Sequence, residues 1–110
     1  QTPPEGVCGD FYFELPALLQ KAVLMADQPG DVVVDIWASQ FVTNTPPTVL
    51  NSITASTPPT LSSSQSSIDT VLSGWDVNLP AQSALRFNIE SIDTIFRFTL
   101  TLVAQVQLPE

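Results

Sequence analysis

The sequence contains no histidine and very few cations. Its 110 residues include 3 lysines and arginines against 11 aspartates and glutamates, which gives a formal net charge of −8. Without histidine there is no imidazole base, no Ser-His or Cys-His nucleophile pair and no common zinc ligand set. Three cations cannot form the basic surface that nucleic acid or anionic lipid requires. These scarcities exclude nucleic-acid binding, attachment to anionic membranes and histidine-based catalysis.

Cysteine and long apolar runs are also scarce. The single Cys8 cannot form a disulfide within the chain, so stability must come from core packing or from other subunits. We favour a buried or unreactive thiol, although a position near the N-terminus also permits an interchain disulfide. The longest apolar run, 18–26, is interrupted by Gln20 and Lys21 and is far shorter than the roughly 20 residues of a membrane-spanning helix. The start at Gln1, with no signal peptide, leads us to expect a processed, trimmed or excised chain.

Apolar residues are plentiful. They make up 44% of the chain, enough for one core, whereas charged residues make up 13%, about half of the ~25% usual in soluble domains. A disordered acidic tail would combine high charge with few apolar residues. The length fits one domain. We therefore expect a single domain over residues 9–110, preceded by an N-terminal arm over residues 1–8.

Alternation with period two predicts β-strands in several places. Residues 11–15, 32–37, 84–91 and 96–106 all show it or are rich in β-branched side chains. In 84–91 the alternation directs Leu85, Phe87 and Ile89 inward. The last strand is the clearest, because one face carries only apolar residues: Phe96, Phe98, Leu100, Leu102, Ala104 and Val106.

A hairpin is predicted around Asp27-Gln28-Pro29-Gly30. Proline fixes φ and glycine accepts positive φ, so this tetrapeptide between two apolar runs is typical of a turn. The run before it, 18–25, has the length of a strand. We therefore expect strand 18–25 to form a hairpin with strand 32–37.

The middle of the chain is rich in proline, serine and threonine. The segment 45–52 (TPPTVLNS) recurs in outline at 57–64 (TPPTLSSS), and its prolines disfavour a central strand at either place. Because each flank is too short for its own core, we expect a long ordered loop at about 43–67. Short strands are expected at 70–73 and 77–79. Seven or eight short strands without a long helix predict an antiparallel β-sandwich, jelly-roll or Ig-like in outline.

Carboxylates are the only side chains that are numerous enough here to suggest acid–base chemistry. Asp27, Asp31 and Asp35 follow one another at four-residue spacing, and oxygen ligands suit Ca²⁺. An extended chain would spread them too far apart, so turn-forming and solvating roles are favoured. A carboxylate pair for glycoside hydrolysis has no specific signal among eleven acids. We predict no catalytic, cofactor-binding or metal-binding residue.

Two arginines are candidate interface contacts. Arg86 and Arg97 occupy outward positions on strands predicted to be neighbours. They could clamp a carboxylate of another subunit, or pair within the sheet with Glu90, Asp35 or Asp93. We favour the pairing within the sheet.

Two tryptophans are candidate glycan contacts. Trp37 and Trp75 each lie at the end of a predicted strand beside a turn. Their rings could form a stacking platform for a sugar, but tryptophans at such positions more often close the rim of a core. We favour the second interpretation.

Several motifs of this sequence resemble, in the same order, motifs of a known protein module. The stretch LMADQPGDVVVDIW at 24–37 resembles an L-A-D-Q-S-G-S-I-V-V-D-I-W stretch in a recurrent module of tailed-bacteriophage structural proteins. The likeness continues in order over about 9–106 through PPTV (46–49), SITAS (52–56), PTLSS (59–63), LSGW (72–75), LRFNIES (85–91) and TLTL (99–102). Here Pro29 replaces a small polar residue, 38–40 lacks a lysine, and the end of the chain is not basic.

The resemblance implies a non-enzymatic β module on the surface of a virion, in a tail-fibre or receptor-binding assembly or in a capsid decoration. It implies a homo-oligomer in contact with other virion proteins, and by analogy with the symmetry of such assemblies a trimer. It brings no cofactor and no established site residue. The alternative is a monomeric carbohydrate-binding module that would take a host-surface glycan on an exposed aromatic platform; a carboxylate-based hydrolase comes third.

Overall fold

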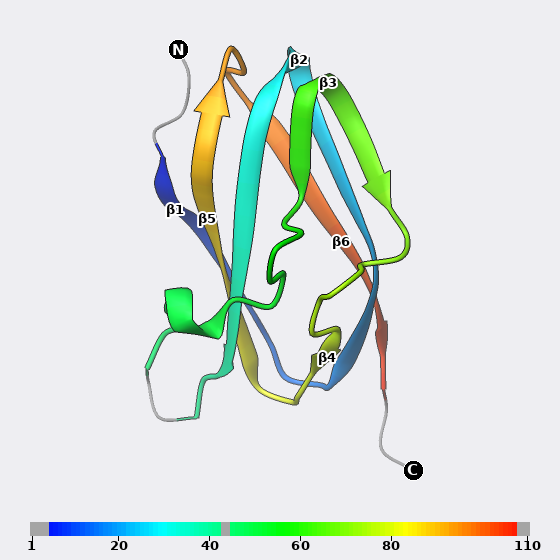
Figure 1. Ribbon diagram of the computed structural model, residues 1–110. Helices are drawn as coiled ribbons and strands as arrows, with labels where there is room; N and C mark the ends of the chain where they lie inside the picture. The colour runs from blue at the N-terminus through cyan, green and yellow to red at the C-terminus, as the bar shows by residue number, and fades with distance from the viewer. Residues whose placement is uncertain (1–4, 43–44, 108–110) are drawn as a thin grey trace.

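One long strand, β2 (Ala17–Gln40), organises the fold. The structure is a computed structural model that describes residues 5–42 and 45–107. β2 rises on one side of the molecule, reverses at the top and descends again (Figure 1). Its apolar and β-branched residues favour extended structure on both sides of the bend, and the bend falls near Pro29-Gly30.

The other elements are short, and all strand pairings are antiparallel. They are β1 (Gly6–Phe13), the 3-10 helix η1 (Val49–Asn51), β3 (Thr60–Asp69), β4 (Asn78–Leu79), β5 (Ser83–Asp93) and β6 (Phe98–Val106). The predicted all-β antiparallel sandwich is confirmed. β1 begins inside the expected arm, because residues 6–8 already belong to a strand; residues 1–4 lie outside the described residues. Within the part of the chain that is described, no helix is long and apolar enough to cross a membrane.

The strands form two layers joined by bent strands. The four-strand layer contains β1, β5, residues 30–40 of β2 and residues 60–64 of β3. The three-strand layer contains β6, residues 17–26 of β2 and residues 66–69 of β3, with β4 at its end. β2 and β3 both pass from one layer to the other at the top (Figure 1).

The predicted hairpin between 18–25 and 32–37 is wrong. The first half of β2 has β6 on one edge and β3 on the other, while the second half lies between β5 and β3. Both edges of each half are therefore taken, and the two halves face each other across the sandwich. The turn residues bend one strand, with register shifts against β3 between Met25 and Val32.

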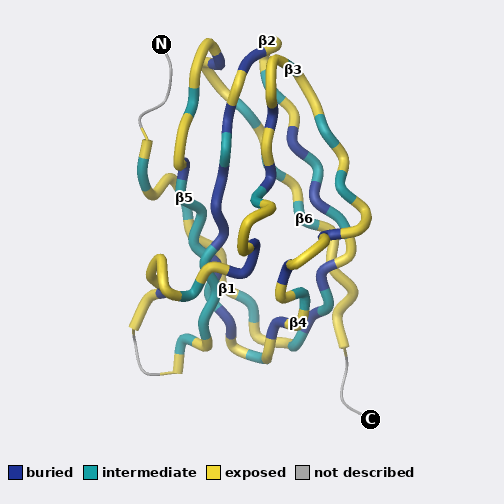
Figure 2. Tube along the Cα trace, in the orientation of Figure 1, coloured by how far each residue is buried: buried dark blue, intermediate teal, exposed yellow. Residues whose placement is uncertain are grey.

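The core lies between the two layers and draws on both halves of β2. The first half contributes Leu19, Ala22 and Leu24, and the second half contributes Val32, Val34 and Ile36. Figure 2 shows buried stretches in dark blue along both halves of β2. From β5, Leu85 and Ile89 are buried and Phe87 packs against both clusters, as the alternation predicted.

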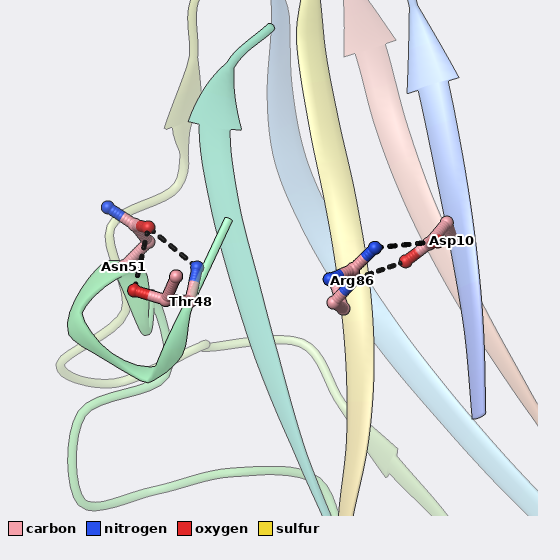
Figure 3. Close-up of polar contacts among 4 residues, drawn as sticks. All are labelled: Asp10, Thr48, Asn51 and Arg86. Atoms are coloured by element: carbon pink, nitrogen blue, oxygen red, sulfur yellow. Dashed lines mark hydrogen bonds and ion pairs between the residues drawn. The ribbon is translucent and has the colours of Figure 1, made fainter. Parts of the chain in front are cut away.

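The predicted loop at about 43–67 is only partly a loop. Residues 60–69 form β3, an edge strand that pairs with β2 and buries Leu61 but leaves most of its serines exposed. The predicted strand at 70–73 is a turn, and 77–79 is reduced to β4. Before β3, η1 begins with a capping box in which Thr48 and Asn51 bond each other (Figure 3). Residues 43–44 lie outside the described residues.

The top of the sandwich is a tightly packed closed corner, formed by residues 25–31 of β2 and by 93–97 between β5 and β6. Gly30 is buried there, and a Cβ atom at this position would lie 2.7 Å from a side-chain carbon of Ile95 and 2.8 Å from the Asp93 carbonyl oxygen. Asp27 accepts hydrogen bonds from the amides of Phe96 and Arg97, both at 3.2 Å. The corner therefore requires a residue without a side chain at position 30.

A buried carboxylate ties the long loop to the four-strand layer. Asp35 accepts hydrogen bonds from the hydroxyls of Ser52 and Thr54, both at 2.7 Å, and from the indole of Trp37 at 3.0 Å. Its own Oδ1 also accepts the Ile36 amide. The predicted solvating role of Asp35 is wrong, because the side chain is buried and bonded by donors from β2 and from the loop that covers it.

Candidate functional site

The side of the sandwich opposite β3 is open, because the two layers differ in width. Within the described residues β1 pairs with β5 alone and β6 with β2 alone. Both layers begin at β3. From there the four-strand layer continues through β2 and β5 to β1, whereas the three-strand layer continues through β2 and ends at β6. β1 therefore has no strand opposite it, and β1 and β6 each leave one backbone edge unpaired.

An apolar groove of about 740 Å³ runs along this open side. Its wall is mostly hydrocarbon. Most of it comes from β1, β5 and β6, with smaller contributions from β2 and β4; the apolar residues of the three main strands are Phe11, Phe13, Leu85, Phe87, Leu100, Leu102, Ala104 and Val106. A second hollow of about 360 Å³ continues it toward Arg97 and shares Gly9, Phe87 and Leu100 with it. We call the two together the apolar groove.

Inward-facing side chains in the groove remain exposed to solvent. Phe11 lies opposite Leu85 in the β1–β5 register and so points to the inner side. It is nevertheless 58% exposed, and Val106, at the end of β6, is exposed as well. Clustered apolar exposure of this kind usually marks a contact surface.

The free edge of β6 carries none of the usual protection. Its sequence, FTLTLVAQV, contains no charged residue, no proline and no glycine. Edge strands of soluble proteins are generally blunted by charges, prolines or bulges. β1 has such devices, since it carries Asp10 and a register shift between Val7 and Gly9. The unprotected edge is that of β6.

Cys8 lies on β1 at this register shift and beside the upper part of the groove. The thiol is exposed, so the buried alternative favoured for it is wrong. Desolvation by its surroundings raises the pKa of Cys8, which keeps the thiol protonated and weakly nucleophilic near neutral pH.

An aromatic hollow of about 510 Å³ lies on the outer face of the four-strand layer. The rings of Tyr12 and Phe41 meet edge to face, with centroids 6.4 Å apart. Beside them Arg86 and Asp10 form a two-point ion pair, with Nε–Oδ1 at 2.7 Å and Nη2–Oδ2 at 3.1 Å (Figure 3). The hydrogen bond from Arg86 holds the pKa of Asp10 below its usual value.

The predicted partners of the arginines are not the observed ones. Arg86 pairs with Asp10, because the β1–β5 register places the two side by side, and not with Glu90, Asp35 or Asp93. Arg97 precedes β6, in a different layer from β5, so the two arginines are not on neighbouring strands. Its side chain is exposed at the upper end of the apolar groove.

The tryptophans do not form a joint platform. Trp75 is 8% exposed within the core, and its indole donates to the Thr57 carbonyl at 2.8 Å. Trp37 is half-buried on the outer face of the four-strand layer and is held by Asp35. Trp75 thus closes the rim of the core, as favoured from the sequence.

The three aspartates at four-residue spacing accept bonds from the protein itself. Asp27 and Asp35 have the partners given above, and Asp31 accepts the Ser63 amide at 2.7 Å. Among the described residues no group of three or more acidic, cysteine or histidine side chains is placed to hold a metal ion.

The sequence analysis predicted neither the apolar groove nor the aromatic hollow. One signal for the aromatic hollow was present, because Tyr12 is an aromatic residue on the outward face of a strand whose inward face already carries Phe11 and Phe13. A second signal, for the groove, was the nine-residue strand without a charge. The difference in width between the layers depends on strand order and had no local signal.

No protein-family model, curated protein or solved structure matches the chain. The function must therefore be argued from the motifs and from the geometry of the groove and the hollow.

Proposed function

We propose that this chain is a non-enzymatic structural module of a tailed-bacteriophage virion, displayed on the particle surface in a tail-fibre, receptor-binding or capsid-decoration assembly. The motifs over 9–106 support this proposal. The observation that carries it is the apolar groove with the uncharged edge of β6, since exposed apolar surfaces and unprotected strand edges of this kind mark contact sites for another polypeptide.

The energetics favour an assembly function. Fully burying a large apolar side chain is worth about 1.5–3 kcal/mol. Phe11, which is 58% exposed, would gain part of this when covered, and several further apolar side chains line the groove. Low charge suits subunit contacts, because the centres of interfaces are depleted in charged residues. We expect a homo-oligomer, a trimer by analogy with fibres and capsid three-fold positions.

Two measurements test the proposal. Light scattering at micromolar concentration should give a mass above that of one chain, and a monomer would contradict the homo-oligomer. Mass spectrometry and antibody labelling of intact, purified particles should find the chain on the surface of the head or tail. Its absence from particles would overturn the virion assignment whatever the mass in solution.

A second candidate, glycan binding, is favoured by the aromatic hollow. Sugars stack on aromatic rings and bond planar charged groups, and Tyr12 and Phe41 lie beside the Arg86–Asp10 pair. On a glycan array we expect binding that Tyr12→Ala abolishes and Phe96→Ala, an exposed aromatic outside the hollow, leaves intact. An array without a hit, or a hit indifferent to Tyr12→Ala, would remove this candidate.

A further inference from the structure

We propose that the apolar groove accepts one extended strand donated by another polypeptide segment, which pairs antiparallel with the free edge of β6 and places alternate apolar side chains between the layers. This inference rests on the proposed function as a structural module and names the kind of contact through which it would assemble. The strand would complete the sandwich in the manner of β-strand addition.

The widths of the layers fix the number of missing strands at one. A strand added beside β6 would lie opposite β1, so that four strand positions would face four. Stacked sheets lie about 10 Å apart, so the inward side chains of the added strand would reach Phe11 and Phe13. The exposure of Phe11 is what the absence of this strand produces.

A whole second copy does not fit the same place edge to edge. If β6 of two copies paired in one continuous sheet, the four-strand layers of both would lie on the same side of it. Each β1 extends beyond its own β6 by one strand position, so it would occupy the position of β5 in the other copy. A donated segment without its own second layer avoids this collision.

The length of β6 sets the length of the donated strand. β6 has 9 residues, which at about 3.3 Å per residue is close to 30 Å of edge. The wall is apolar from Phe98 to Val106 on its inner face. The donated segment should therefore be about nine residues long, with apolar residues at every second position.

The charges at the two ends of the groove define the rest of the partner. Glu14 lies at the end near Val106, and Arg97 lies at the end near Phe98. The middle of β6 is uncharged. A strand antiparallel to β6 enters at the Val106 end, so it should carry a basic residue at its start and an acidic residue at its end.

The test uses a synthetic peptide of this design and the intact chain. The peptide begins with Lys, alternates Val or Leu with Thr, and ends with Glu; the control peptide has the same composition with its apolar residues made consecutive. We expect saturable binding by fluorescence anisotropy, at least tenfold weaker for the control peptide. Hydrogen exchange should slow at β6 amides on binding and stay unchanged in β3, an edge strand on the opposite side of the sandwich.

A pair of variants locates the contact. Phe11→Asp changes an exposed side chain and should leave the fold intact by circular dichroism, yet it should weaken peptide binding at least tenfold because it places a charge against the apolar strand. Ile68→Asp changes a side chain that is 67% exposed on β3 and should leave binding unchanged. Binding that ignores Phe11→Asp, or no binding by a folded protein, would overturn the proposal.

One further outcome separates a second copy from a donated strand. If the chain associates with itself and the peptide neither competes with that association nor protects β6, a neighbouring copy fills the groove and the proposal is wrong. These measurements use isolated protein, whereas the virion assignment is tested on particles. Either can therefore fail without the other.

Discussion

The closed corner and the open side of the sandwich are built from the same kind of strand but differ in what faces them. Val32, on the inner face of β2 next to the closed corner, is 0% exposed, because the other half of the same strand lies opposite it. Phe11, on the inner face of β1, is 58% exposed, because no strand lies opposite. An alternating pattern thus sets which way a side chain points, while the strand order decides whether it is buried.

Polar groups follow the same division. At the corner and beneath the long loop, the carboxylates of Asp27 and Asp35 are bonded by donors of this chain. On the open side, the backbone edges of β1 and β6 have no strand to bond within the described residues. The corner satisfies its polar groups with donors of this chain, whereas the open side is where we propose that a donated strand binds.

The largest difference should appear when one inner side chain is truncated in each region. Leu24→Ala, on the covered part of β2, should cost about 2–5 kcal/mol, because it leaves a cavity. Phe11→Ala should lower the free energy of unfolding by less than about 1 kcal/mol, since more than half of the Phe11 side chain is already exposed to water. Chemical denaturation measures both, and equal losses would mean that the groove is covered by this chain itself.

Removing the Asp35 carboxylate should lower the free energy of unfolding nearly as much as Leu24→Ala does. Asp35→Ala leaves the hydroxyls of Ser52 and Thr54 and the Trp37 indole without their acceptor, at about 2–4 kcal/mol. Thermal unfolding would record the loss, and proteolysis should become faster within 45–59. Asp31→Asn is the matched control and should be nearly neutral, because this carboxylate is exposed and accepts a hydrogen bond from the Ser63 amide.

Two glycines provide a smaller contrast. Gly30→Ala should destabilise the corner by about 1–3 kcal/mol, because the new methyl group would overlap Ile95 and the Asp93 carbonyl. Gly9→Ala, on the open side, meets nothing within 4 Å and should be neutral or stabilising by up to about 1 kcal/mol. A stable Gly30→Ala variant would show that the corner can relax.

The smallest effect concerns acid and salt. The Arg86 hydrogen bond lowers the pKa of Asp10, so its contribution to stability is present above the ordinary carboxyl pKa and is lost as pH falls through the lowered value. The stability difference between the wild type and Asp10→Asn should therefore vanish toward acid pH. Because the Asp10 side of the pair is exposed to solvent, high salt should also weaken the ion pair.

Asp27 at the corner is the counterpart for this measurement. Desolvation raises its pKa, but hydrogen bonds from the amides of Arg97 and Phe96 outweigh that effect, and its pKa also lies below the ordinary value. The contribution of Asp27 to stability should therefore also be lost as the pH falls through its lowered pKa. Salt should change it less than Asp10, since fixed backbone amides supply most of the stabilisation; an equal salt response would contradict this distinction.

Local pattern predicted the strands well where one face is buried. The alternation of 84–91 and 96–106 corresponds to β5 and β6, because inward positions of these strands meet the core. The serine-rich strand β3 was missed, since only Leu61 within it is buried and its pairing depends on β2. Serine hydroxyls exposed on an edge carry little signal for a strand.

Long-range order could not be predicted from local signals. Pro29-Gly30 marks a reversal of the chain, but nothing local tells whether the two arms pair or separate into different layers. The partner of Arg86 depends on the register between β1 and β5, which joins residues 76 apart in sequence. Two of the hydrogen-bond donors to Asp35, the hydroxyls of Ser52 and Thr54, lie in the covering loop, so the burial of Asp35 depended on the same unknown arrangement.

The length of β2 has a consequence for how the molecule is made. Residues 17–40 are synthesised before every strand that pairs with them, because those strands lie within 60–106. The nascent chain must hold the first half of β2 without β6 until residue 106 has emerged. Distant pairings slow folding and prolong exposure of unpaired strands, so the bent strand that unites the two layers also makes the yield of folded protein depend on strands that are synthesised well after it.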